Sequence, residues 1–161
     1  MTWLPLISPR YGEVSVWMDA PPATVWALVS DVTRIGEFSP ETFEARWIRG
    51  ADGPAEGAQF KGHVKRNGVG PTYWSLCTVT VCETERAFEF AVGPDAMAVN
   101  NWGYRLEPRD GGTLVTEFFR LEPTLPIRLY WMALGFLRGP TNLRGMRTTL
   151  ERMKDVVEAE S

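Results

Sequence analysis

The sequence has a single histidine, His63, and lacks the common motifs for binding a nucleotide or activating a serine. One histidine excludes HExxH and every metal site built on two histidines. There is no GxGxxG after a strand-like segment, no GxxxxGK followed by Ser or Thr, and no GxSxG. We therefore expect a protein that uses no metal, nucleotide or other cofactor.

Cysteine is also scarce: the chain has two, Cys77 and Cys82, in the run WSLCTVTVCE. In a strand, five steps of about 3.3 Å separate them by about 16 Å on opposite faces. A disulfide requires Cα atoms within about 7 Å of each other. The sequence therefore predicts reduced thiols and a cytoplasmic location, and the start MTWLPLISPRYGE lacks the basic segment that opens a signal peptide.

Positive charge is limited as well. Lys and Arg number 17 against 20 Asp and Glu, for a formal net charge of −3, and no long basic run is present. Binding along the phosphates of a nucleic acid depends on clustered Lys and Arg. We expect no nucleic-acid partner.

Aromatic residues, by contrast, are abundant: the 161 residues include 7 Trp, 8 Phe and 4 Tyr. Such side chains suit a hydrophobic core, and equally a pocket for a flat or hydrophobic ligand. The length favours one domain over residues 1–161, enough to bury about two-thirds of the unfolded surface. No repeat or linker divides the chain.

Two prolines mark the first change of pattern. Residues 13–18 (EVSVWM) alternate as in a half-buried strand, with Val14, Val16 and Met18 on one face. Pro21 and Pro22 follow; the residues before them are pushed out of the helical region, while Pro22 itself suits a first helical position. The sequence predicts a sharp strand-to-helix corner, a helix from about Pro22 with an apolar stripe that reaches Val32, and a second short helix near RIGEFSPE.

The middle of the chain has a period of two. Six strand-like segments are separated by Gly, Pro, Asn and Asp turns: FEARWIRG, AQFKGHVKRNG, TYWSLCTVTVCETE, AFEFAVG, VNNWGYRLEPRDGG and TLVTEFFRLEP. The link PRDGG (108–112) is a hairpin signal. With residues 13–18 these segments predict about seven strands, mostly antiparallel.

The C-terminal region returns to helical spacing. Residues 139–161 carry an apolar stripe typical of an amphipathic helix, formed by Leu143, Met146, Leu150, Met153 and Val157. Residues 125–137 (LPIRLYWMALGFL) are apolar nearly all round, but thirteen residues span only about 20 Å as a helix, too short to cross a membrane. We expect this segment to be buried in the core or in a homodimer contact; the alternatives are a lid over a pocket or an interfacial anchor.

This order predicts an α+β fold, a seven-stranded antiparallel sheet wrapped around a long C-terminal helix, with two short helices after the first strand. One helix does not fill the concave face of so large a sheet, so a cavity follows. The chain resembles the START-like polyketide cyclase/dehydrase superfamily (SRPBCC) from about Glu13 to Glu158. The resemblance rests on APPATVWALVSD, GAQFKGHVKRNG with YWSLCTVT, WGYRLEPRDGGTLVTE and NLRGMRTTLERMK. It implies the helix-grip fold.

The superfamily includes aromatase/cyclases, lipid and sterol carriers, quinone-binding proteins and chaperone co-factors, so resemblance alone does not settle function. Two functions stay open. One is a cyclase/dehydratase-like enzyme for a hydrophobic polyketone, in which positioning in the cavity promotes reaction. The other is a non-catalytic carrier or sensor of a lipid, quinone or other hydrophobic ligand.

Three residues are candidates for catalysis. Glu117 shares the strand parity expected to face inward, although the opposite parity would place it in solvent. Alternation with Phe60 points His63 outward unless the strand bulges at Gly62. Glu117 or His63 would remove an acidic C–H, and Tyr104 or an arginine would stabilise the enolate oxygen.

The ligand-binding candidates are inward-facing positions on the strands and the C-terminal helix. Asn100, Trp102 and Tyr104 share one face of their strand. In a helix-grip fold the core and the cavity wall are the same surface. The full set is Phe60, Trp74, Phe90, Asn100, Trp102, Tyr104, Phe119, Asn142, Met146 and Leu150.

Overall fold

A computed structural model describes residues 11–65, 70–94, 100–121 and 125–161, with the backbone alone described for 125–142. The elements follow in this order: β1 (Tyr11–Met18), α1 (Pro22–Val29), the 3-10 helix η1 (Val32–Glu37), β2 (Thr42–Ile48), β3 (Gln59–Val64), β4 (Tyr73–Glu83), β5 (Ala87–Val92), β6 (Asn100–Arg109), β7 (Gly112–Leu121) and α2 (Leu125–Glu160). The predicted α+β order is confirmed.

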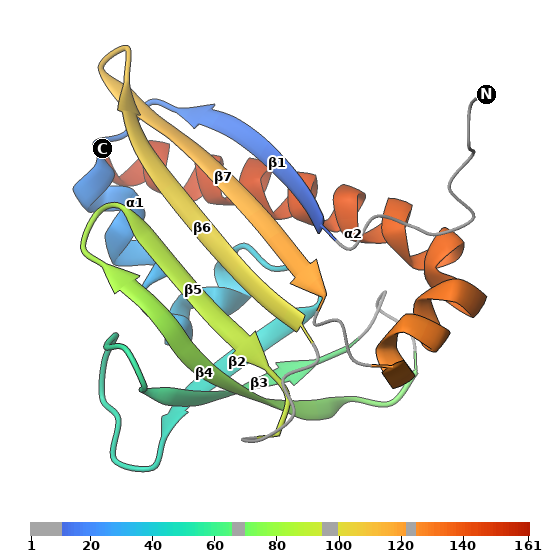
Figure 1. Ribbon diagram of the computed structural model, residues 1–161. Coiled ribbons are helices and arrows are strands. Elements are labelled where there is room, and N and C mark those ends of the chain that lie inside the picture. The colour runs from blue at the N-terminus through green and yellow to red at the C-terminus, as the bar shows by residue number, and fades with distance from the viewer. Residues whose placement is uncertain (1–10, 66–69, 95–99, 122–124) are drawn as a thin grey trace, which may run out of the picture.

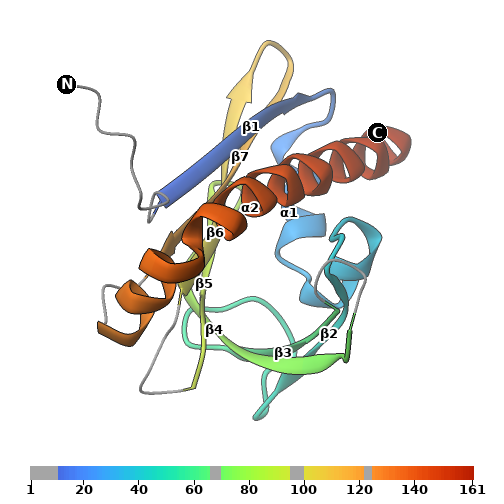
Figure 2. The ribbon, with the colours of Figure 1, turned by 90° about the vertical axis from the view of Figure 1, so that its right-hand side faces the viewer.

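The strands form one antiparallel sheet in the order β1-β7-β6-β5-β4-β3-β2. Hairpins join consecutive strands from β2 to β7, and β1 adds to the far edge beside β7. The sheet curves strongly, and α2 lies across its concave side (Figures 1 and 2). This is the predicted helix-grip fold.

The proline corner forms as predicted. Pro21 is extended, with φ −67° and ψ 154°, and α1 begins at Pro22. Val25, Leu28 and Val29 are buried on the inner side of α1. Val32, which the spacing assigned to the same stripe, instead opens η1, because Asp31 caps a new turn by accepting from the backbone N–H of Thr33 at 3.1 Å.

The C-terminal helix differs from the prediction. Residues 125–137, expected as a separate segment, belong to the 36-residue helix α2. Pro140 lies inside this helix. An internal proline removes one backbone hydrogen bond, and it can bend a helix without ending it. The helix changes direction in its first half (Figure 1). Whether 125–137 forms a lid, core or homodimer contact concerns side chains outside the described residues.

The second half of α2 has the predicted buried stripe, with one exception. Met146, Leu150, Met153 and Val157 are at most 1% exposed, whereas Leu143 is 38% exposed. No described helix is long and apolar enough to cross a membrane. Both cysteines, Cys77 and Cys82, are free thiols, as predicted.

The two faces of β7 are both covered. Val115, Glu117 and Phe119 face the concave side and are buried. Phe118 points to the opposite face and is also buried, because the guanidinium groups of Arg105 and Arg120 lie 4.7 and 5.9 Å from its ring. The inward parity proposed for Glu117 is therefore the one observed.

Candidate functional site

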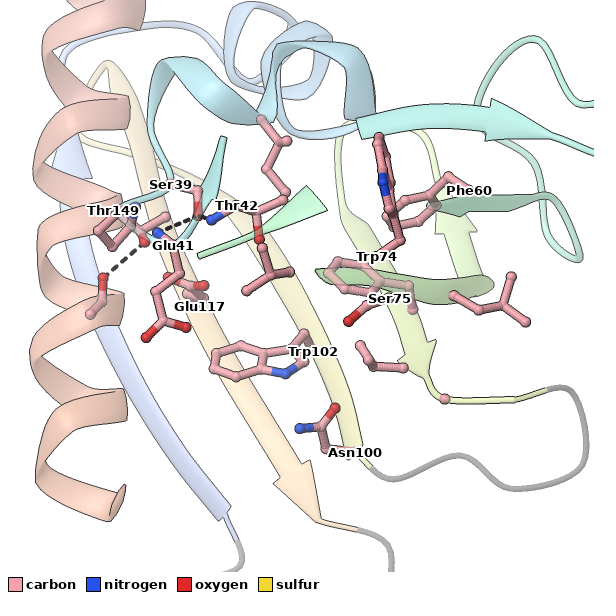
Figure 3. Close-up of a pocket in the computed structure, with 18 of the residues that line it drawn as sticks. Ser39, Glu41, Thr42, Phe60, Trp74, Ser75, Asn100, Trp102, Glu117 and Thr149 are labelled. Atoms are coloured by element: carbon pink, nitrogen blue, oxygen red, sulfur yellow. Dashed lines mark hydrogen bonds between the residues drawn. The ribbon is translucent and has the colours of Figure 1, made fainter. Parts of the chain in front are cut away.

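A cavity of about 590 Å³ lies between the concave face of the sheet and α2. This volume falls in the range of small-molecule sites. Aromatic residues from four strands, β3 to β6, form much of its wall, among them Phe60, Phe90 and Trp102. Met146 and Thr149 line it from α2, and Thr149 is labelled in Figure 3. The cavity that we predicted on the concave face of the sheet is therefore present.

Most of the sequence-predicted ligand contacts lie at this cavity. Those that line it are Phe60, Trp74, Phe90, Asn100, Trp102, Tyr104 and Met146, and Glu117 lines it as well. Phe119 and Leu150 are instead fully buried members of the hydrophobic core. The side chain of Asn142 lies outside the described residues.

Glu117 and Tyr104 form a polar pair in the cavity wall. They face each other across β7 and β6, and the Tyr104 hydroxyl donates to Glu117 Oε1 at 3.3 Å. Glu117 is 5% exposed and Tyr104 is 6% exposed. Among the described residues, Glu117 Oε2 has no hydrogen-bond partner. The carboxyl group therefore has one satisfied and one unsatisfied oxygen.

Burial sets the charge of this pair. It raises the pKa of the Glu117 carboxyl well above the usual value, against an opposing effect of the Tyr104 hydrogen bond. Burial and the neighbouring Glu117 also raise the pKa of Tyr104 well above its usual value. Because Oε1 accepts the hydrogen bond from the Tyr104 hydroxyl, the proton of a neutral Glu117 carboxyl belongs on Oε2. In its neutral form, which burial favours, Glu117 has an O–H donor on the wall of the cavity.

A second unsatisfied polar atom lies farther along β6. Asn100 lines the cavity, and its Oδ1 is buried without a partner in the described part of the chain. Trp102 lies between Asn100 and the Glu117 end of the cavity (Figure 3). Its ring packs on Phe119 with centroids 5.4 Å apart. Each buried polar atom of this kind costs stability unless a ligand or water satisfies it.

His63 lies on the other face of the sheet from Phe60. Its ring stacks on Trp74 with centroids 4.2 Å apart, and its Nδ1 is 2.9 Å from Glu44 Oε1. The register through Gly62 is continuous, so the bulge that would have turned His63 inward is absent from β3. The structure thus brings Glu117 and Tyr104 together without His63, and it turns the Trp74 ring toward His63 although Trp74 also borders the cavity.

The segment after η1 supplies lining residues that the sequence did not reveal. Ser39, Glu41 and Thr42 line the cavity. Ser39 Oγ accepts from the backbone N–H groups of Glu41 and Thr42, at 3.3 and 2.9 Å, and so holds the segment in place. Other lining residues missed are Ile35, Pro40, Val64, Tyr73, Ser75, Leu76, Val92, Gly93, Pro94, Gly145 and Thr149.

Gly145 and Thr149 could have been found. They lie beside Met146 and Leu150 at helical spacing, so an inward Met146 predicts that they share its side of α2. Thr149 Oγ1 donates to the Gly145 carbonyl at 2.8 Å. No comparable pattern marks Glu41, because the segment after η1 is irregular.

The fold and cavity define a helix-grip protein with an internal cavity of small-molecule size, and sequence comparison places it in a family. The family model described as "Polyketide cyclase / dehydrase and lipid transport" matches residues 12–158. The chain therefore belongs to this family. Comparison with curated proteins gave no match. Among the described residues, no group of three or more His, Cys, Asp or Glu is arranged to hold a metal ion.

Solved structures support the same assignment. A polyketide cyclase-like protein from Corynebacterium glutamicum is 30% identical, with a TM-score of 0.65 over 94% of this chain and 93% of that one. A START superfamily protein from Mycobacterium smegmatis is 16% identical, with a TM-score of 0.72 over 94% and 99%. The di-domain ARO/CYC protein StfQ of the steffimycin pathway is 12% identical, with a TM-score of 0.70 over 94% of this chain and 51% of StfQ. The last two likenesses concern the fold alone.

Proposed function

We propose that this protein binds a neutral, hydrophobic carbonyl compound in its cavity and acts on it as a cyclase/dehydratase-like enzyme. The observation that carries the proposal is the buried carboxyl group of Glu117: the residue lines the cavity, and its Oε2 has no partner among the described residues. A carbonyl oxygen is the natural acceptor for the Oε2 proton. The family and the aromatic wall support a hydrophobic ligand.

The proposed chemistry is an intramolecular aldol-type closure. The enol carbon of a 1,3-diketone attacks a second carbonyl carbon, and a new carbon–carbon bond forms. The attacked oxygen takes the Oε2 proton of Glu117, and the carboxylate recovers the proton that the enol hydroxyl releases. Tyr104, donating to Oε1, stabilises the transient carboxylate. The protein ends the cycle unchanged.

Conservative variants test these roles. Glu117→Gln retains an acceptor for Tyr104 and a donor for the ligand, but it has no proton to transfer. We expect it to bind an aryl triketone and to cyclise it about 100-fold more slowly or worse. Tyr104→Phe should cause a smaller loss, since Glu117 keeps its proton. The measurement is product formation by chromatography, and unchanged turnover in both variants would contradict the catalytic proposal.

The second candidate is a non-catalytic carrier. It is favoured by the large share of apolar and aromatic residues in the wall, and by the position of His63 away from Glu117. A carrier would bind the same triketone in wild type and in Glu117→Gln with equal product formation, no faster than in buffer. The turnover assay therefore separates the two candidates.

A further inference from the structure

The cavity has two unsatisfied polar atoms rather than one. Glu117 and Asn100 line the same cavity, and the atoms Glu117 Oε2 and Asn100 Oδ1 are both buried without a partner within the described ranges of the chain. An amide oxygen accepts a hydrogen bond, whereas a neutral carboxyl group donates one from its O–H. A ligand that satisfies both atoms therefore needs an acceptor at the Glu117 end and a donor at the Asn100 end.

The sheet fixes the separation of these two atoms. Glu117 pairs with Tyr104, and Asn100 lies four residues from Tyr104 on β6. Four residues of a strand span about 13 Å, which is close to the length of a small fused-ring ketone together with a hydrogen bond at each of its ends. The Trp102 ring lies between the two ends (Figure 3). It offers a flat apolar surface to whatever joins them.

The charge of the wall limits the ligand further. The lining residues that the structure describes include the carboxyl groups of Glu41 and Glu117 and no Lys, Arg or His. A buried anion needs a cationic partner or several donors to replace its hydration. The described wall provides no cationic side chain for a carboxylate ligand and already carries two carboxyl groups, so a neutral molecule fits it better.

We propose that the ligand is a neutral, flat molecule with a carbonyl oxygen at the Glu117 end and a hydroxyl group at the Asn100 end, its ring body lying along Trp102. This assignment rests on the proposed function, because it uses the same cavity and the same carboxyl group. It adds Asn100 as the residue that selects the hydroxyl end. It also excludes fatty acids and other carboxylates as good ligands.

A set of rigid naphthalenes tests the proposal by fluorescence titration. The probes are 6-acetyl-2-naphthol, its 6-methoxy ether 2-acetyl-6-methoxynaphthalene, 6-ethyl-2-naphthol and 6-hydroxy-2-naphthoate. We expect wild type to bind the hydroxy ketone about tenfold more tightly than the methyl ether and than the ethyl compound, each of which loses one hydrogen bond. The carboxylate should bind most weakly.

Variants assign each preference to a residue. In Asn100→Leu the preference for hydroxyl over methoxy should vanish while the preference for ketone over ethyl remains. Asn101→Leu, which changes the next residue of β6 on the opposite face, is the matched control and should keep both preferences. Thermal melting checks that each variant is folded.

The outcomes separate the two levels of the proposal. Equal binding of the hydroxy ketone and its methyl ether by wild type overturns the two-ended ligand but leaves cavity binding intact. If folded Asn100→Leu still prefers the hydroxyl compound over its methyl ether, the two-ended ligand is likewise overturned and cavity binding stands. If Asn100→Leu does not fold, the wild-type contrast alone decides. If wild type binds none of the neutral probes, the proposed function fails together with the inference.

Discussion

Replacing Gly145 with phenylalanine is expected to abolish ligand binding and leave the protein folded. Gly145 lies in α2 and lines the cavity, and a Cβ atom built there has no heavy atom within 4 Å. A ring at this position therefore enters the cavity instead of displacing the core. Glycine within a helix is about 1 kcal/mol less favourable than alanine, so removing it does not weaken α2.

Titration with 6-acetyl-2-naphthol, followed by its fluorescence, measures this effect. We expect at least a 100-fold loss of affinity in Gly145→Phe, because the added ring occupies the space of the ligand. The matched control, Gly145→Ala, adds one methyl group and should bind nearly as wild type, with the free energy of unfolding raised by up to about 1 kcal/mol. Wild-type affinity in a folded Gly145→Phe variant would show that the ligand binds elsewhere.

Replacing Glu117 with glutamine is expected to make the protein more stable than wild type at neutral and alkaline pH. Burial raises the pKa of Glu117 well above 4.5, its value in an unfolded chain. At a pH between these two pKa values, the Glu117 carboxyl is protonated in the folded state and ionised in the unfolded state. The wild-type free energy of unfolding therefore falls as pH rises through that window, by up to about 1.4 kcal/mol per pH unit.

Glutamine has the shape of the neutral carboxyl group and does not ionise, so Glu117→Gln lacks this loss. Urea denaturation over a pH series that begins below 4.5 should show two curves that diverge as pH rises. Glu107→Gln is the control, since Glu107 lies on the surface with a side chain 58% exposed. Parallel curves for wild type and Glu117→Gln would mean that Glu117 is not held neutral by the fold.

Much of this fold could be predicted because its signals are local. Alternation along residues 13–18 and the prolines that follow define β1, the corner and the start of α1 within the chain itself. The stripe from Met146 to Val157 likewise fixes the buried face of α2. These features depend on spacing and backbone restriction, which a single sequence displays.

The remaining features depend on tertiary contacts. The direction in which the side chains of β7 point was ambiguous because Phe118, on the convex face, is buried as well. Its ring contacts Arg105, Arg120 and the ring of Tyr11, and both Arg105 and Tyr11 are distant from Phe118 in the sequence. The hydrogen bond between Tyr104 and Glu117 requires the register of β6 and β7.

Two further features were equally hidden from the sequence. Glu41 reaches the cavity from an irregular segment that Ser39 holds in place. Such a segment has no helical or strand periodicity in its sequence. The continuity of α2 through Pro140 was hidden because proline in a sequence usually signals the end of a helix.

The carbonyl stretching frequency of a bound ketone tests the central claim most directly. The probe is 2-acetylnaphthalene labelled with ¹³C at the carbonyl, bound to wild type and to Glu117→Leu and measured by infrared difference spectroscopy. A hydrogen bond from Glu117 Oε2 to the ketone oxygen lowers this frequency, so we predict a lower value in wild type than in Glu117→Leu. The same frequency in both proteins would contradict the assignment of Glu117 as the group that holds the ligand's carbonyl.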